Sequence, residues 1–117
     1  IHNPAYQGNF PKSLAEYAGL SDRYYNIEGY EFYGKMSFLK AGLRYSDFNY
    51  TVSEQYAREI RSHRFGAGFE GIFRQLHDRN KLIGILNGID HNKWDPALPN
   101  PNLRYSFSKN DMRGKAK

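Results

Sequence analysis

The sequence contains no cysteine and no long hydrophobic run. The absence of cysteine from 117 residues excludes disulfides, thiolate zinc sites and cysteine nucleophiles, and it suits a reducing compartment. The longest apolar stretch, residues 82–86, includes a glycine and is far shorter than the ~20 residues that a bilayer-spanning helix requires. We therefore expect no membrane partner and no chemistry that depends on thiols.

Positive charge is in modest excess but does not form a continuous stripe. Seventeen Lys and Arg against twelve Asp and Glu give a formal charge of +5. Basic residues gather at 58–64 and at 113–117, and the signs alternate along the helices between them. This pattern favours solvated helix faces over a nucleic-acid partner. With 39% hydrophobic and 25% charged residues, the composition fits one small folded domain.

Hydrophobic spacing predicts an α/β fold. The continuous apolar run 81–86 is typical of a parallel strand covered on both faces. Alternation of helices and strands predicts a Rossmann-like parallel sheet with flanking helices. In order, we predict a short helix from Ser13 to Gly19, an aromatic loop over 21–35, a helix over 37–45 with Lys40 and Arg44 on its polar face, a strand over 48–52, a helix capped by Ser53, a helix over 69–77 and a strand over 81–86.

Two short motifs match known signatures in the wrong context. Residues 66–71 fit G-x-G-x-x-G, but the preceding segment has the pattern of a polar helix, whereas dinucleotide binding needs a strand there. We interpret 66–71 as a connection. The Asn49–Thr51 glycosylation sequon lies in a predicted strand and is expected to be idle. The four histidines are too scattered for a standard metal-ligand spacing, so no metal is expected.

His2 and Asn3 are the candidate binding residues. They follow a predicted strand end, and open α/β sheets bind ligands at the carboxyl ends of their strands. An imidazole and an amide can both donate and accept hydrogen bonds to sugar hydroxyls. A histidine that only satisfies a loop carbonyl is the alternative. Nearby Tyr6 could offer a flat face to a sugar ring or pack in the core.

Several strings, in order and spacing, resemble the bacterial glycogen synthase and plant starch synthase family. The resemblance covers nearly the whole chain and includes the glycine-rich loop at 66–71 before a short helix. The strings that carry it are His2–Gly8, Phe38–Gly42, Thr51–Ser53, Tyr56–Ile60 and Gly84–Asp90, followed by Trp94 and Pro96.

The resemblance implies a GT-B glycosyltransferase, with two Rossmann-like domains facing a cleft. Such an enzyme transfers glucose from ADP-glucose to the non-reducing 4-hydroxyl of an α-1,4-glucan, with retention and with neither metal nor cofactor. Residues 1–98 would be the C-terminal part of the N-terminal, acceptor-side domain. Residues 99–117 would be the linker and the start of a helix leading to a C-terminal domain. The partners would be ADP-glucose, glycogen or a starch primer, and the remainder of the parent chain.

The resemblance also implies roles for individual residues. His2 resembles the active-site histidine that contacts the donor glucose near its 6-hydroxyl, and Asn3 is expected to touch sugar hydroxyls. Asn87 resembles a cleft-lining residue. Pro4 departs from the aliphatic residue usual in the family and restricts Asn3 toward extended conformations. Lys40, Asp90 and Trp94 belong to family motifs and are expected to support the structure.

Two matters stay open from the sequence. The cellular location implied is the cytoplasm of a bacterium or, for a plant protein, the plastid stroma. The alternative function is a non-catalytic α-glucan-binding module, in which a tyrosine-rich surface holds oligosaccharide while another chain acts.

Overall fold

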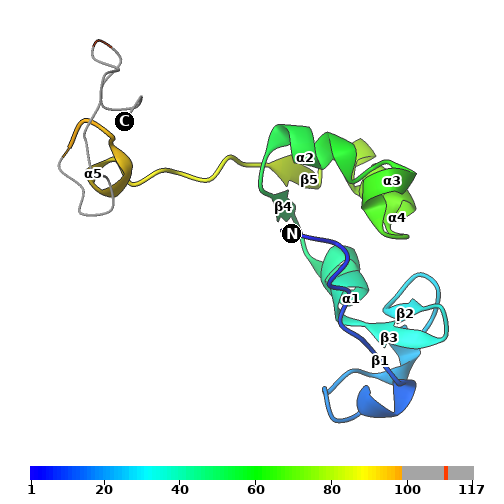
Figure 1. Ribbon diagram of the computed structural model, residues 1–117. Helices are drawn as coiled ribbons and strands as arrows, with labels where there is room; N and C mark the ends of the chain where they lie inside the picture. The colour runs from blue at the N-terminus through cyan, green and yellow to red at the C-terminus, as the bar shows by residue number, and fades with distance from the viewer. Residues whose placement is uncertain (99–109, 111–117) are drawn as a thin grey trace. The chain divides into compact units, whose positions relative to one another are not determined.

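The computed structural model describes residues 1–98 and residue 110. The chain divides into two units, Ile1–Leu86 and Asn87–Lys117, and each is described by itself (Figure 1). The predicted linker and helix start over 99–117 lie outside the described residues, apart from Asn110, so this boundary stays a prediction. Within the described residues, no helix is long and apolar enough to cross a membrane.

The first unit combines two small sheets with helices (Figure 1). One sheet is antiparallel with strand order β1-β3-β2, and the other is a parallel pair, β4 and β5. In chain order the elements are β1 (Asn9–Phe10), η1 (Lys12–Leu14), η2 (Asp22–Tyr24), β2 (Glu31–Phe32), β3 (Lys35–Ser37), α1 (Phe38–Tyr45), β4 (Asn49–Thr51), α2 (Glu54–Glu59), α3 (His63–Gly66), α4 (Glu70–Asp78) and β5 (Leu82–Gly84).

The predicted helix from Ser13 to Gly19 is wrong in its start. Only a 3-10 turn, Lys12–Leu14, forms, and its N-cap is Pro11 without a side-chain hydrogen bond. The end is as predicted, because Gly19 has φ +69° and the N–H of Leu20 donates to the carbonyl of Ala15 at 2.9 Å. This bond and the left-handed glycine are those of a Schellman motif.

The predicted aromatic loop contains a β-hairpin instead. β2 and β3 pair antiparallel, with Glu31 opposite Met36. Tyr33 and Gly34 connect them with φ values of +49° and +77°, as in the two-residue turns that match the twist of a hairpin. A tyrosine in the left-handed region is unusual, which is why this turn carried no recognisable sequence signal.

α1 forms as predicted, but Lys40 lies on its buried side. Ser37 caps the helix by accepting a hydrogen bond from the N–H of Lys40. The prediction that Lys40 belongs to the polar face is wrong, since this residue is only 4% exposed. Its Nζ donates hydrogen bonds to the carbonyl oxygens of Ile27 and Glu31, so the preceding loop provides polar partners that helical periodicity cannot reveal.

The predicted parallel sheet is confirmed. β4 and β5 run parallel, with Tyr50 opposite Ile83, and α2, α3 and α4 lie between them in the chain. In β4 the polar residues face inward, because Asn49 and Thr51 are buried while Tyr50 is exposed. Ser53 caps α2 through a 2.9 Å hydrogen bond from the N–H of Tyr56, as the sequence indicated.

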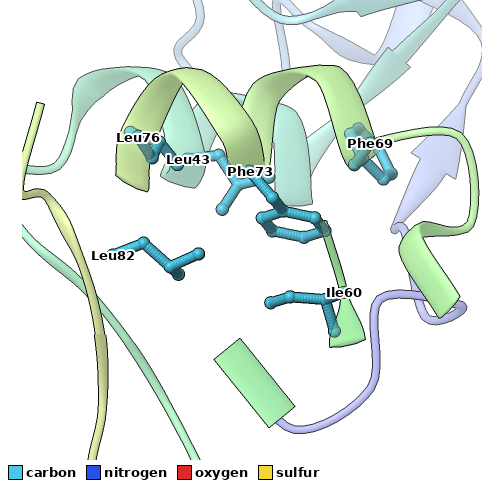
Figure 2. Close-up of a cluster of buried hydrophobic side chains, with 6 residues drawn as sticks. All are labelled: Leu43, Ile60, Phe69, Phe73, Leu76 and Leu82. Carbon is cyan, nitrogen blue, oxygen red and sulfur yellow. The ribbon is translucent and has the colours of Figure 1, made fainter. Parts of the chain in front are cut away.

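The main core gathers between the helices and the parallel pair (Figure 2). The Phe73 ring lies near the middle of the group. Phe32 of the hairpin stacks on Phe69, the residue before α4, with ring centroids 4.2 Å apart, which joins the hairpin to this core. The buried members are Leu43, Ile60, Phe69, Phe73, Leu76 and Leu82.

The described part of the second unit contains one short helix, α5 (His91–Trp94). Asp90 caps it by accepting a hydrogen bond from the N–H of Asn92 at 3.0 Å. Asp90 therefore has a structural contact of the kind that its family motif led us to expect.

Candidate functional site

The first residue of the chain lies beside β4. The Ile1 amine donates a hydrogen bond to the carbonyl of Tyr50, and the Thr51 hydroxyl donates to the carbonyl of Ile1 at 2.9 Å. Thr51 is the last residue of β4. His2 and Asn3 therefore lie near the carboxyl end of β4, the edge at which α/β sheets bind ligands.

The segment after Ile1 is held in a tight turn. The side-chain oxygen of Asn3 accepts a hydrogen bond from the N–H of Ala5 at 2.9 Å. The Asn3 carbonyl accepts a second bond from the N–H of Tyr6. Pro4 lies inside this turn and is buried, whereas His2 and Asn3 are exposed. The turn therefore accommodates the proline that replaces the aliphatic residue usual in the family.

An open cavity of about 390 Å³ lies next to His2 and Asn3. Its walls come from the turn after Ile1, the end of β4, and the segment from α2 to the residue after α3. The lining residues are His2, Asn3, Ala5, Val52, Tyr56, His63, Arg64, Phe65 and Ala67.

The lining combines hydrogen-bonding groups with aromatic and aliphatic surface. Imidazole and amide groups both donate and accept hydrogen bonds, and the Arg64 guanidinium adds donors. Tyr56 and Phe65 add aromatic surface. None of the residues that line the cavity is acidic, and among residues 1–98 and 110 no group of three or more His, Cys, Asp or Glu gathers as metal ligands would.

The α2–α3 wall of this cavity escaped the sequence analysis. His63 and Arg64 were assigned to a solvated basic run, and Phe65 to the exit of a helix. α2 ends at Glu59 and α3 begins only at His63, and this break is visible only in the structure. Such a break turns the chain, and here it directs α3 toward the end of β4, where the cavity forms.

The glycine-rich segment 66–71 is a connection between two helices. α3 precedes it and α4 begins at Glu70, so the strand that a dinucleotide fingerprint requires is replaced by a helix. The interpretation as a connection is confirmed. The sequon at Asn49 lies in β4, where the asparagine is buried and donates to the carbonyl of Leu43.

Asn87, the third predicted binding residue, begins the second unit. It is exposed and lies outside regular secondary structure. Its role at a cleft stays a prediction, as do the sugar contacts of His2 and Asn3.

Comparisons with known proteins agree on one family. The family model described as starch synthase catalytic domain matches residues 1–75. The glycogen synthase of Paramagnetospirillum magneticum is 46% identical over 99% of this chain and 23% of its own length. That of Serratia proteamaculans is 44% identical over 100% of this chain and 24% of its own length. That of Mannheimia succiniciproducens is 52% identical over 82% of this chain and 20% of its own length.

One solved structure is similar over nearly the whole chain. It is the catalytic domain of starch synthase IV from Arabidopsis thaliana bound to ADP and acarbose, 32% identical, with a TM-score of 0.77 over 97% of this chain and 23% of that one. The chain thus spans between a fifth and a quarter of the length of the relatives that it matches. The predicted resemblance is confirmed, and so is an α/β fold with a parallel sheet. With its family model matched over residues 1–75, this chain belongs to the starch synthase catalytic domain family.

Proposed function

We propose that this chain is the acceptor-side part of an enzyme that transfers glucose from ADP-glucose to the non-reducing 4-hydroxyl of an α-1,4-glucan, with retention. Family membership supports this proposal. So does the Arabidopsis starch synthase IV structure, which is described as bound to ADP and acarbose. The observation that carries it is the cavity at the carboxyl end of β4, which His2 and Asn3 line together.

In the proposed reaction, the bond between glucose C1 and the β-phosphate oxygen breaks, and ADP leaves with the electron pair. The 4-hydroxyl oxygen of the glucan forms the new bond to C1, and its proton passes to the β-phosphate oxygen of the departing ADP. His2 and Asn3 would hold the donor glucose through its hydroxyls and so fix C1 relative to the acceptor. Groups that neutralise the departing diphosphate would come from outside this chain, and neither metal nor cofactor would be required.

The test uses the full-length protein that carries this sequence. Incorporation of radiolabelled glucose from ADP-glucose into glycogen should fall on the order of 10²-fold for His2→Ala, a barrier increase of roughly 3 kcal/mol. His77→Ala is the matched control, since His77 is an exposed histidine of α4 that is not among the cavity-lining residues. Undiminished turnover of His2→Ala would refute the role of His2.

The same assay separates the alternative function. Full-length protein that binds glycogen but incorporates no glucose would be a glucan-binding module, and the transferase proposal would fail. The 117-residue chain alone is expected to show no transfer. We place the activity in the cytoplasm, as expected from the bacterial glycogen synthases that the chain resembles.

A further inference from the structure

A second histidine of the cavity is hydrogen-bonded to a half-buried carboxylate. His63, the first residue of α3, places its Nδ1 2.9 Å from Oε1 of Glu70, the first residue of α4. The His63 side chain is 96% exposed, whereas that of Glu70 is only 17% exposed. The imidazole is therefore open to solvent and to the cavity, and its Nδ1 is held by the hydrogen bond to Glu70.

The glycine-rich connection makes this pair possible. Ala67 and Gly68 both have positive φ, +52° and +87°, and they reverse the chain between α3 and α4. A Cβ on Gly66 would lie 2.6 Å from Cβ of Glu70 and 2.8 Å from its Oε2. Because glycine leaves that space empty, the Glu70 side chain can pack there and reach His63.

The pair determines which ring nitrogen faces a ligand. A carboxylate only accepts hydrogen bonds, so Nδ1 of His63 carries the proton toward Glu70. The hydrogen bond from His63 is the main cause that lowers the pKa of Glu70, and Glu70 is thus ionised at neutral pH. Nε2 of His63 remains for a ligand as an acceptor when the ring is neutral and as a donor when it is protonated.

The residues around His63 are those expected for a sugar chain. Tyr56 and Phe65 line the same cavity with aromatic surface, and Arg64 adds hydrogen-bond donors. Sugar hydroxyls donate and accept, and the apolar faces of sugar rings pack on aromatic rings. His2 and His63 come from different walls, so a donor glucose at His2 leaves the α3 side of the cavity to a second sugar.

We propose that His63, held in place by Glu70, binds a hydroxyl of the α-glucan acceptor on the α3 side of the cavity. This inference rests on the proposed function and extends it to a second wall of the site. His63 touches the acceptor, and Glu70 is a positioning residue that acts through His63.

The test measures KM separately for ADP-glucose and for maltoheptaose, with the full-length protein. His63→Ala should raise KM for maltoheptaose about tenfold and leave KM for ADP-glucose near the wild-type value. Glu70→Gln should raise KM for maltoheptaose about threefold, because the partner of the ring becomes a neutral amide that accepts more weakly from Nδ1 and can also donate to it. His77→Ala should change neither value. A rise in KM for ADP-glucose alone, or an unchanged KM for maltoheptaose in His63→Ala, would overturn the inference.

Two further measurements test the positioning role of Glu70 and test this inference separately from the proposed function. Long-range ¹H–¹⁵N spectra should show Nδ1 of His63 protonated in wild type and a mixture of tautomers in Glu70→Gln; identical ring spectra would remove the positioning role of Glu70. Should the wild-type protein transfer no glucose, the proposed function fails while calorimetric titration with maltoheptaose still tests this inference. Weaker binding by His63→Ala than by His77→Ala would then support it, and equal binding would overturn it.

Discussion

Nζ of Lys40 lies 2.6 Å from the carbonyl oxygen of Ile27, thirteen residues earlier in the chain. A second hydrogen bond joins the same ammonium to the carbonyl of Glu31 at the start of β2. Lys40 thereby fastens the loop before the hairpin to α1. Burial lowers the pKa of Lys40, because desolvation disfavours the charged ammonium, and the two carbonyl contacts offset part of that cost.

Replacing Lys40 by methionine is expected to destabilise the protein by about 2 kcal/mol. Methionine keeps most of the volume but leaves two carbonyl oxygens without their donor, and unpaired buried groups cost roughly 1–3 kcal/mol. Thermal unfolding followed by circular dichroism measures the effect. Lys35→Met, at an exposed position of β3, is the matched control and should change stability by less than about 0.5 kcal/mol. Equal melting temperatures of the two variants would contradict the fastening role.

Local chemistry made much of this fold predictable. Ser53 was identified as an N-cap from the sequence because a hydroxyl before an amphipathic segment satisfies free helix N–H groups. The apolar run 81–86 indicated a parallel strand covered on both faces. β5 does pair with β4 in parallel, but it covers only Leu82–Gly84, and Ile85 and Leu86 are exposed. The cap depends only on neighbours in the chain, and the strand was indicated by a local run of apolar residues.

The features that were missed depend on partners far away in the chain. The buried position of Lys40 requires carbonyl oxygens of the preceding loop. The hairpin requires Tyr33 at positive φ, and the adjacent Phe32 stacks on Phe69, which is far away in the chain. His2 and Asn3 were found because a strand end and a family motif coincide there. Phe65 carried no such signal, since only the path of α3 brings it to the cavity.

Gly84 is expected to tolerate no side chain. A Cβ at this end of β5 would lie 2.3 Å from the carbonyl oxygen of Ser53 and 2.4 Å from the backbone nitrogen of Glu54. Backbone atoms at the start of α2 would have to move, so Gly84→Ala should destabilise the protein by about 1–3 kcal/mol. Because α2 carries Tyr56 of the cavity wall, KM for maltoheptaose should rise in the full-length protein as well.

Gly42→Ala is the control for that substitution. Nothing lies within 4 Å of a Cβ at Gly42, which occupies the interior of α1. Alanine there should stabilise the helix by roughly 0.5–1 kcal/mol. Urea unfolding of both variants decides the matter: a Gly84→Ala midpoint at or above that of Gly42→Ala would show that β5 and α2 can separate without cost.

The contribution of Glu70 to stability should disappear in acid. The hydrogen bond from His63 is the largest cause that lowers the pKa of Glu70 below its ordinary value of 4.5. A carboxyl whose pKa is lower in the folded than in the unfolded state binds fewer protons when folded, so its stabilising effect is complete above pH 4.5 and is lost as the pH falls through the folded value. The difference in unfolding free energy between wild type and Glu70→Gln should therefore be constant near neutrality and shrink below about pH 4.5.

Urea unfolding at a series of pH values between about 3 and 6 measures this difference. Glu16→Gln, which changes an exposed carboxyl, is the control. A difference that grows in acid would mean that the His63–Glu70 pair strains the connection between α3 and α4 instead of stabilising it.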